Sequence, residues 1–476
     1  MMGRARILLL LLGLASLLQA MAGERIVTGF QPGLPQGREV LQQVPVKVLV
    51  AEFIDPQSTG LGKSLGYMLW REALTAIQDQ RGAGVIYAHT GADRPLADLL
   101  RRDYHLAALE IARAQNSRVV LWGAVAEEGG QVYVDSYLTT LPELVGDSLS
   151  LTVRLNGRTL PDLSSEVGRS RYGFAQRRYD RKELFRRAVV IRGGTRLRRS
   201  PSRSAPVVTR IPATTALQAL DMQGSWFRVR RDDGSSAWVE IGGVDLPPRR
   251  VRIDRDRINV RSGPGRTRIL RTLDLHGEFP VLDSRYLPGD GVWYRLRFPW
   301  GSGWVAAFLT EPRFTLPAIQ FLAGLQRYQL ENYEQASLAF RRFIDEAGST
   351  ESNVNLAAAH ALLGASRLMQ DAESRDGRRQ IDRAVELTPY DPMVYDLRLL
   401  SDLARPGVVG AGAVDDLDRS LRLDPRNSRT LALLRAVTAL SRGDPQYRPL
   451  NHLFRLDPER GGILSRLQRI HLDGHR

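Results

Sequence analysis

One pattern occurs twice in the middle of this chain, and it constrains the fold more than any other feature. The blocks of the first occurrence are residues 197–201, 226–230 and 237–239, and those of the second are 260–264, 293–297 and 303–305. Corresponding blocks begin 63, 67 and 66 residues apart. This spacing indicates the tandem duplication of a small domain. Each copy alternates short apolar runs with Gly, Pro and Asp, which is typical of a small all-β barrel.

The same part of the chain carries the excess of positive charge. Residues 171–313 contain 29 Lys and Arg against 14 Asp and Glu, a difference equal to the net charge of +15 of the whole chain. An anionic partner for this region is therefore the first hypothesis.

The first 22 residues predict a secretory signal peptide. Two arginines precede a Leu-rich run over residues 7–18, and a small-x-small site follows at Ala20 and Ala22. No later stretch approaches the roughly 18 apolar residues of a membrane helix, so we expect an exported chain without a membrane span, in the periplasm or outside the cell. An uncleaved signal anchor is the alternative. The chain has no Cys, which excludes disulfides, a lipid-bearing cysteine and thiolate metal sites.

Residues 44–156 alternate strand and helix signals and predict an α+β domain with helices on one face of a small sheet. We expect strands at 46–53 and 85–87, helices at 61–77 and 95–115, and a hairpin with arms 119–126 and 131–138 around Gly129 and Gly130. The apolar strand ending at Gly123 and the Gly-turn hairpin after it resemble the amino-terminal domain of the translocation protein TolB. This resemblance implies a binding or scaffolding domain of the cell envelope, without catalytic residues.

Residues 157–187 are rich in Arg with interleaved aromatic residues and predict a basic linker. Stacking and pairing on a polyanion is the alternative for this segment. The two copies of the duplicated domain then occupy residues 188–247 and 250–312. The stretches 259–264, 293–296 and 303–305 resemble the bacterial Src-homology-3-like (SH3-like) domain family, which implies a binding groove. The second copy is the better match, because the first has Arg199-Ser200-Pro201 where a Gly-Pro turn is expected.

Residues 314–476 carry a helical repeat of another kind. Leu-x-Pro endings at residues 386–389, 422–425 and 455–458 follow each other at intervals of 36 and 33 residues. With Gly324, Tyr333, Ala336 and Phe340 upstream, this region resembles the tetratricopeptide repeat, whose period is about 34 residues. We expect four irregular helix pairs in a short solenoid with a groove for a protein partner. A self-contained bundle is the alternative.

Three features imitate catalytic or metal sites. The stretch Gly60–Ser64 lies between a strand and a helix like a phosphate-binding loop, but the first glycine of that motif is replaced by Gln57. Residues 146–149 read Gly-Asp-Ser-Leu, like the nucleophile block of a lipase and esterase family, yet no His has an Asp three residues before it. The seven histidines form no metal-ligand pattern. We therefore expect no enzyme activity, no cofactor and no metal.

We predict a noncatalytic adaptor of the cell envelope with a multidomain fold: an α+β amino-terminal domain, two all-β barrels and an α-helical solenoid. The barrel pair is expected to bind peptidoglycan or a peptide through arginines beside exposed aromatic residues. The residues expected to bind the ligand are Arg198, Arg228, Arg261, Tyr286, Tyr294, Arg295 and Trp300. Trp226, Trp238, Trp293 and Trp304 are instead expected in the barrel cores.

Two alternatives remain open at this point. The first is a polyanion binder acting through the Arg-rich middle of the chain, although nucleic acid is not the partner we favour. The second is a cell-wall hydrolase with an unrecognised site.

Overall fold

A computed structural model describes residues 27–28, 46–77, 83–88, 104–114, 116–141, 148–155, 158–287, 289–404, 411–427, 429–431 and 433–434. The expected signal peptide and the third Leu-x-Pro ending lie outside these residues. The chain divides into two compact units. The first holds residues 1–145, 170–330 and 345–350, and the second holds 146–169, 331–344 and 351–476.

The first unit begins with a six-stranded sheet in the order β1-β3-β2-β4-β5-β8. Strand β2 runs parallel to both of its neighbours, whereas β4, β5 and β8 form an antiparallel meander. The turn between β4 and β5 is made by Gly129 and Gly130, both at positive φ, as the sequence predicts. The strands are β1 (Val27–Thr28), β2 (Val46–Ala51), β3 (Ala83–Ala88), β4 (Val119–Glu128), β5 (Gln131–Thr140) and β8 (Arg171–Asp180).

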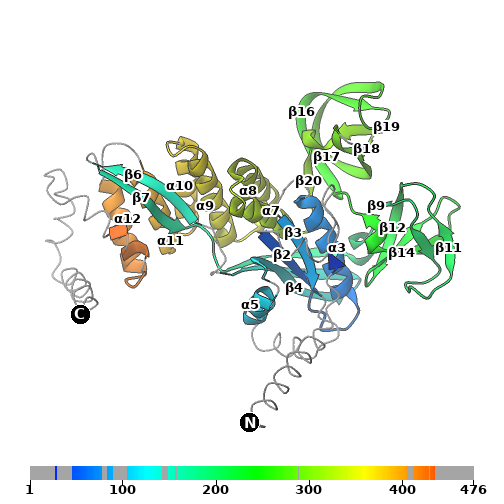
Figure 1. Cartoon of the computed structure of the whole chain (residues 1–476), viewed down its shortest axis with the longest axis horizontal. Coiled ribbons are helices and arrows are strands. Elements are labelled where there is room, and N and C mark those ends of the chain that lie inside the picture. The colour runs from blue at the N-terminus through cyan, green and yellow to red at the C-terminus, as the bar shows by residue number, and fades with distance from the viewer. Residues whose placement is uncertain are drawn as a thin grey trace, which may run out of the picture. The chain divides into compact units, whose positions relative to one another are not determined.

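Helices cover both faces of this sheet rather than the single face that we expected. Helix α5 (Tyr104–Ala114) packs Ala108 and Ala112 on Leu49, Val120 and Trp122. Helix α3 (Leu61–Ala76) lies on the other side (Figure 1), where Trp70 Nε1 donates to the carbonyl of Val85 at 3.3 Å. The expectation of one covered face was wrong, since all six residues of β2 are buried and a strand points alternate side chains to opposite faces.

The segment predicted as a basic linker contains regular structure. Residues 171–180 form β8, and α6 (Arg181–Leu184) follows with an N-cap from Asp180, whose side chain accepts from the backbone N–H of Lys182. Tyr172 and Phe174 of β8 pack on Phe321 of α7 (Pro317–Gln329), with ring centroids 4.7 and 5.6 Å apart. The aromatic residues between the arginines thus belong to the core of the first unit, which is why this segment is not a solvated tether.

Residues 188–245 form a seven-stranded antiparallel sheet in the order β11-β10-β14-β13-β12-β9-β15. We refer to it as the first barrel sheet. Its core includes Leu197, Phe227, Val229 and Val239, all nearly inaccessible to solvent. The strands are β9 (Ala188–Ile191), β10 (Arg196–Arg198), β11 (Val207–Arg210), β12 (Thr215–Gln223), β13 (Trp226–Arg230), β14 (Ser236–Glu240) and β15 (Val244–Asp245).

Residues 250–313 form a five-stranded sheet in the order β17-β18-β19-β16-β20, with β16 also paired to β17. We refer to it as the second barrel sheet. Its core gathers Val251, Val260, Tyr294, Leu296 and Val305. The strands are β16 (Arg250–Arg261), β17 (Ile269–Leu287), β18 (Gly291–Phe298), β19 (Gly301–Ala306) and β20 (Glu311–Arg313).

The second unit is mainly helical. Helices α9 and α10 pack closely because two glycines face each other: a Cβ on Gly364 would stand 2.7 Å from the carbonyl oxygen of Gly377. Helix α10 ends at Leu387 and α12 at Leu423, directly before two of the predicted Pro-containing breaks. The helices are α8 (Tyr333–Ala347), α9 (Asn353–Gln370), α10 (Arg375–Leu387), α11 (Pro392–Leu403) and α12 (Ala411–Leu423). Among the described residues, no helix is long and apolar enough to cross a membrane.

Candidate binding sites

A row of four side chains crosses the first barrel sheet. Arg198 of β10 lies opposite Trp238 of β14, Trp238 lies opposite Arg228 of β13, and Arg228 lies opposite Asp221 of β12. Residues directly opposite each other in an antiparallel sheet point to the same face, so these side chains form one Arg-Trp-Arg-Asp row.

The second barrel sheet carries the same row in the same order. Arg261 of β16 lies opposite Trp304 of β19, Trp304 opposite Arg295 of β18, and Arg295 opposite Asp283 of β17. In both sheets a β-bulge precedes the Asp, whose carboxylate accepts from the next backbone N–H, at 2.8 Å for Asp221 and 2.7 Å for Asp283. The structure therefore places the four arginines predicted to bind ligand in two equivalent rows.

The two arginines of each row differ in their bonding. The first fixes a loop: Arg198 Nη1 donates to the carbonyl of Ala205, and Arg261 Nη1 to that of Thr267, each at 2.6 Å. The second is more open, since Arg228 is half-buried and 4.0 Å from Asp221, and Arg295 is exposed. Arg228 and Arg295 are consequently the guanidinium groups of the rows best placed to meet a ligand.

The aromatic residues expected at the surface are mostly covered. Tyr286 is 59% exposed, but Tyr294 is only 4% exposed because it alternates inward on β18 with Leu296 and Phe298. Trp300 is half-buried and stacks on Phe298 with centroids 5.0 Å apart. The expectation of an exposed Tyr294 was wrong. The buried Tyr294, Leu296 and Phe298 alternate along β18 with the exposed Arg295 and Arg297, so Tyr294 lies on the face that points into the core.

The expected core tryptophans are buried with one exception. Trp226, Trp293 and Trp304 are each less than 10% exposed, whereas Trp238 is half-buried. Trp293 and Trp304 pack together with Ala306 in a cluster separate from the main core of the second barrel sheet. The side chain of Trp304 is therefore largely covered within its row.

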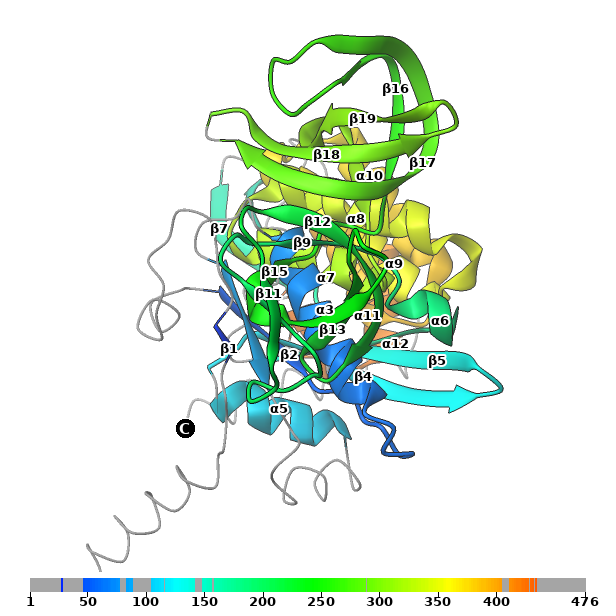
Figure 2. The same cartoon turned by 90° about the vertical axis from the view of Figure 1, so that its right-hand side faces the viewer.

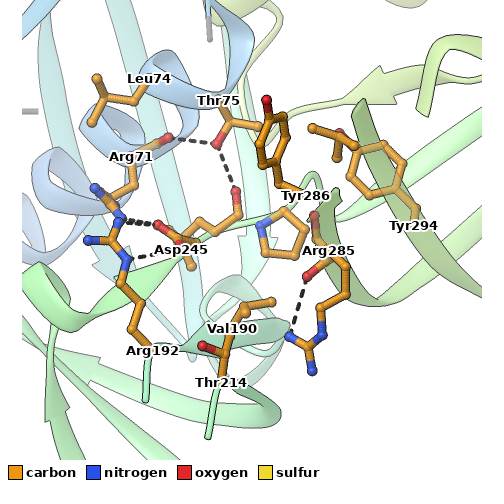
Figure 3. A pocket seen from close by; sticks show the side chains of 14 residues that line it. Arg71, Leu74, Thr75, Val190, Arg192, Thr214, Asp245, Arg285, Tyr286 and Tyr294 are labelled. Carbon is orange, nitrogen blue, oxygen red and sulfur yellow. Dashed lines mark hydrogen bonds and ion pairs between the residues drawn. The ribbon is translucent and has the colours of Figure 1, made fainter. Parts of the chain in front are cut away.

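A pocket of about 620 Å³ opens within the first unit, between α3 and the two barrel sheets (Figure 3). The sequence did not predict it, because its residues come from six separate stretches. Helix α3, β9, β17 and β18 each contribute, together with Thr214 and the stretch after β15. The lining residues are Arg71, Leu74, Thr75, Val190, Arg192, Thr214, Asp245, Leu246, Pro247, Ser284, Arg285, Tyr286, Val292 and Tyr294.

One wall of this pocket is an ion-pair group centred on Asp245. Its carboxylate accepts from Arg71 Nη2 at 2.8 Å and from Arg192 Nη2 at 2.5 Å. Arg71 also donates to the carbonyl of Val244, and Thr75 Oγ1 donates to that of Leu246 at 2.8 Å. Burial lowers the pKa of Arg71 to about 10, against the opposing effect of Asp245, and the guanidinium remains charged at neutral pH.

The opposite wall is formed by the second barrel sheet. Arg285 Nη2 lies 3.1 Å from Asp283 Oδ2, and the exposed ring of Tyr286, the next residue, points away from this guanidinium (Figure 3). Burial raises the pKa of Asp283, an effect that Arg285 partly offsets. Of the seven predicted ligand-binding residues, Tyr286 and Tyr294 line this pocket, while the other five lie elsewhere.

The features that imitate catalytic sites have structural roles here. Gly60 adopts a φ of 79° at the start of α3, and Ser64 Oγ accepts from the backbone N–H of Gly224 at 2.8 Å. Ser148 begins β6, which pairs with β7 in a hairpin. Among the described residues, no group of three or more His, Cys, Asp or Glu could hold a metal ion.

One face of the helical unit, formed by α9 and α11, is covered by the chain itself. The hairpin of β6 (Ser148–Leu155) and β7 (Arg158–Glu166) lies against α9 and α11, the first helices of their pairs (Figure 1). Leu149 is fully buried, Leu151 is 5% exposed, and Arg169 pairs with Asp391 at the start of α11. A partner for this face would meet the hairpin first.

The bacterial SH3 domain family matches residues 193–244, so the first barrel sheet contains a bacterial SH3 domain. The match falls on the first copy, which we had expected to be the poorer one. No curated protein matches the chain.

Three solved structures are similar to parts of the chain. The first TPR of Spaghetti (RPAP3) bound to an HSP90 peptide is 15% identical, with 26% of this chain and 90% of that one covered and a TM-score of 0.22. NlpC2 from Trichomonas vaginalis is 14% identical, covering 30% of this chain and 56% of that one, with a TM-score of 0.16. NlpC1 from the same organism is 14% identical, covering 27% and 46%, with a TM-score of 0.15. The chain thus spans about half the length of each NlpC structure, and likenesses this low carry no argument about function.

Proposed function

We propose that this chain is an exported, noncatalytic binding protein of the bacterial cell envelope, with residues 250–313 as a second SH3-like copy beside the first. One observation carries the proposal. The row in the sheet that matches the bacterial SH3 family recurs in the other sheet with the same residue types and registers. A pair of similar surfaces on one chain favours a repetitive ligand, because linked sites bind such a ligand more tightly than either alone.

The chemistry of the rows suits an extended ligand that carries carboxylates. Each row offers a guanidinium beside a tryptophan, which combines charge-assisted hydrogen bonds with an aromatic surface. Cell-wall peptides are extended and acidic, so we propose peptidoglycan, or a peptide of similar chemistry, as the ligand. Arg228 and Arg295 would make the principal contacts.

The remaining parts would connect this binding module to other proteins. The six-stranded sheet would serve as a scaffold like the TolB amino-terminal domain, and the paired helices would dock a protein partner. Since β6 and β7 lie on α9 and α11, that partner would either displace the hairpin or bind another face of the helices.

Cosedimentation of the full chain with purified peptidoglycan sacculi tests the proposal. We expect retention at about 50 and 300 mM salt, lost in the Arg228→Gln/Arg295→Gln variant. The control is Arg230→Gln/Arg297→Gln, which removes equal charge from exposed positions two residues further along the same strands. Equal retention by the two variants would contradict a role for the rows.

The polyanion alternative predicts a different salt response. Binding that depends on counterion release falls by orders of magnitude over this salt range, and both double variants would weaken it equally. Zymography on purified walls separates the noncatalytic proposal from a hydrolase: a cleared band from the full chain would overturn it.

A further inference from the structure

The pocket between α3 and the two barrel sheets has the composition of a ligand site and touches the rows only through Arg285, which pairs with Asp283 of the second row. We propose that it binds the free carboxylate end of a short apolar peptide. This inference does not depend on the proposed function, because none of the four row arginines lines the pocket.

The size of the pocket sets the size of the ligand. Its volume of about 620 Å³ falls within the range of roughly 300–1,000 Å³ that is usual for small-molecule sites. Apolar side chains of Leu74, Val190, Leu246, Pro247 and Val292 line much of it. A peptide of two or three residues with apolar side chains fits both the volume and this lining.

The charges of the pocket select one negative charge. Three guanidinium groups line it, from Arg71, Arg192 and Arg285, and two carboxylates face them, Asp245 in the lining and Asp283 against Arg285. The excess of one positive charge matches a single carboxylate better than a doubly charged phosphate. A planar guanidinium also binds a carboxylate with a matching pair of hydrogen bonds.

Both contacts to the ligand would come from the second barrel sheet. Arg71 and Arg192 share Asp245, whose side chain is 50% exposed, and Arg285 pairs with Asp283, whose side chain is 10% exposed. An incoming carboxylate would compete with Asp283 for the guanidinium of Arg285. Tyr286, the next residue along β17, is 59% exposed and offers a face on which an apolar side chain can pack. Figure 3 shows its ring on the side of Tyr294, while the guanidinium of Arg285 extends towards Val190 and Thr214.

Ligand-observed NMR titration of the full chain with N-acetyl leucyl-tyrosine and with its carboxamide tests the assignment. We expect the acid to bind at least about tenfold more tightly than the amide, because removing a charge-assisted hydrogen bond usually weakens binding by that much or more. Equal affinities, or no binding of either compound at millimolar concentration, would overturn the proposal.

Substitutions in the two walls of the pocket are expected to change the affinity for the acid in opposite directions. Arg285→Gln should abolish the preference for the acid, whereas Asp245→Asn should strengthen binding of the acid several-fold, because it removes the competing carboxylate. Tyr286→Ala should weaken the acid and the amide alike. If the pocket binds no ligand, none of the three substitutions should change the affinity for the acid or the amide.

Matched controls are available elsewhere on the chain. Tyr390→Ala removes a tyrosine with 60% exposure from the second unit, and Arg297→Gln removes an exposed arginine of β18 that does not line the pocket. Both should bind the acid like the unaltered chain. If either weakens binding as much as its counterpart in the pocket, the assignment is wrong.

Discussion

The two barrel sheets carry the same row of side chains but are attached to the rest of the first unit by different residues. The first is joined to α3 through the Ser64–Gly224 hydrogen bond and the Arg71–Asp245 ion pair. The second is joined at its end, where the backbone N–H and hydroxyl of Thr315 donate to Glu72 at 2.9 and 2.7 Å. The rows within the two sheets are thus alike, whereas the residues that attach the sheets to the rest of the unit differ.

Glu72 is the residue that connects both attachments. Besides Thr315, it pairs with Arg187 just before β9, and both side chains of this ion pair are 1% exposed. Arg187 in turn donates to the carbonyl of Pro247 at 2.5 Å, in the segment between the two sheets. A single buried carboxylate therefore holds the beginning of one sheet and the end of the other.

The largest expected effect comes from removing this carboxylate. Glu72→Ala leaves the Arg187 guanidinium buried without its partner, and breaking a buried pair in this way costs about 3–5 kcal/mol. We expect urea unfolding to show a loss of this size for the first unit. Glu128→Ala, at an exposed position of β4, is the control and should change the free energy of unfolding by less than about 0.5 kcal/mol.

The next effect distinguishes the two sheets at equivalent positions. Ala237 and Gly303 occupy equivalent positions, because each lies opposite the residue that follows the second arginine of its own row. However, a Cβ on Gly303 would stand 2.3 Å from Val260 Cγ1. Val260 is fully buried, so Gly303→Ala forces the core apart and should cost about 1–3 kcal/mol. If Gly303→Ala leaves the melting temperature unchanged, the second barrel sheet can hold an alanine at this position as the first does at Ala237.

A pH-dependent contribution comes from Glu346, which faces the end of the second sheet. Burial raises its pKa from 4.5 to about 7, despite Arg313 Nη1 at 3.6 Å and the nearby Arg177. The folded state therefore binds this proton more tightly than the unfolded state, and stability falls as pH rises from about 4.5 through 7.

Glu346→Gln should remove this slope. The substitution should raise the free energy of unfolding at pH 8 by on the order of 1–3 kcal/mol relative to the unaltered chain, with little difference at pH 4.5. Denaturant unfolding at both pH values measures it. An equal change in the free energy of unfolding at pH 4.5 and pH 8 would show that Glu346 is ionised in the folded state at both pH values.

The smallest expected effect concerns the attachment of the first sheet alone. Ser64→Ala removes the acceptor for the Gly224 N–H and should cost about 1 kcal/mol, the usual contribution of one hydrogen bond. Hydrogen exchange should accelerate around Gly224 and remain unchanged in β18. Faster exchange in both sheets would mean that they are not attached independently.

Local patterns in the sequence predicted most of the elements. The strands and helix from Val46 to Ala76, the Gly129-Gly130 hairpin and the positions of both barrel sheets all follow from periodicity and turn residues. Segment 157–187 did not, because a strand at a sheet edge needs few apolar residues and its arginines outnumber its buried Tyr172 and Phe174. The burial of Tyr294 was not predicted either, although Tyr294 alternates with the exposed Arg295 and Arg297 along β18, because a tyrosine side chain can lie either in a core or at a surface.

The amino-acid sequence by itself determined the repeated blocks, and with them the two Arg-Trp-Arg-Asp rows. Strand register is a local property fixed by alternation and turns, so similar blocks give similar rows. Only the tertiary structure decided the pocket, the buried Glu72 contacts and the hairpin on α9 and α11. Each of these joins residues far apart along the chain, and such contacts depend on how separate elements pack, which no local pattern encodes.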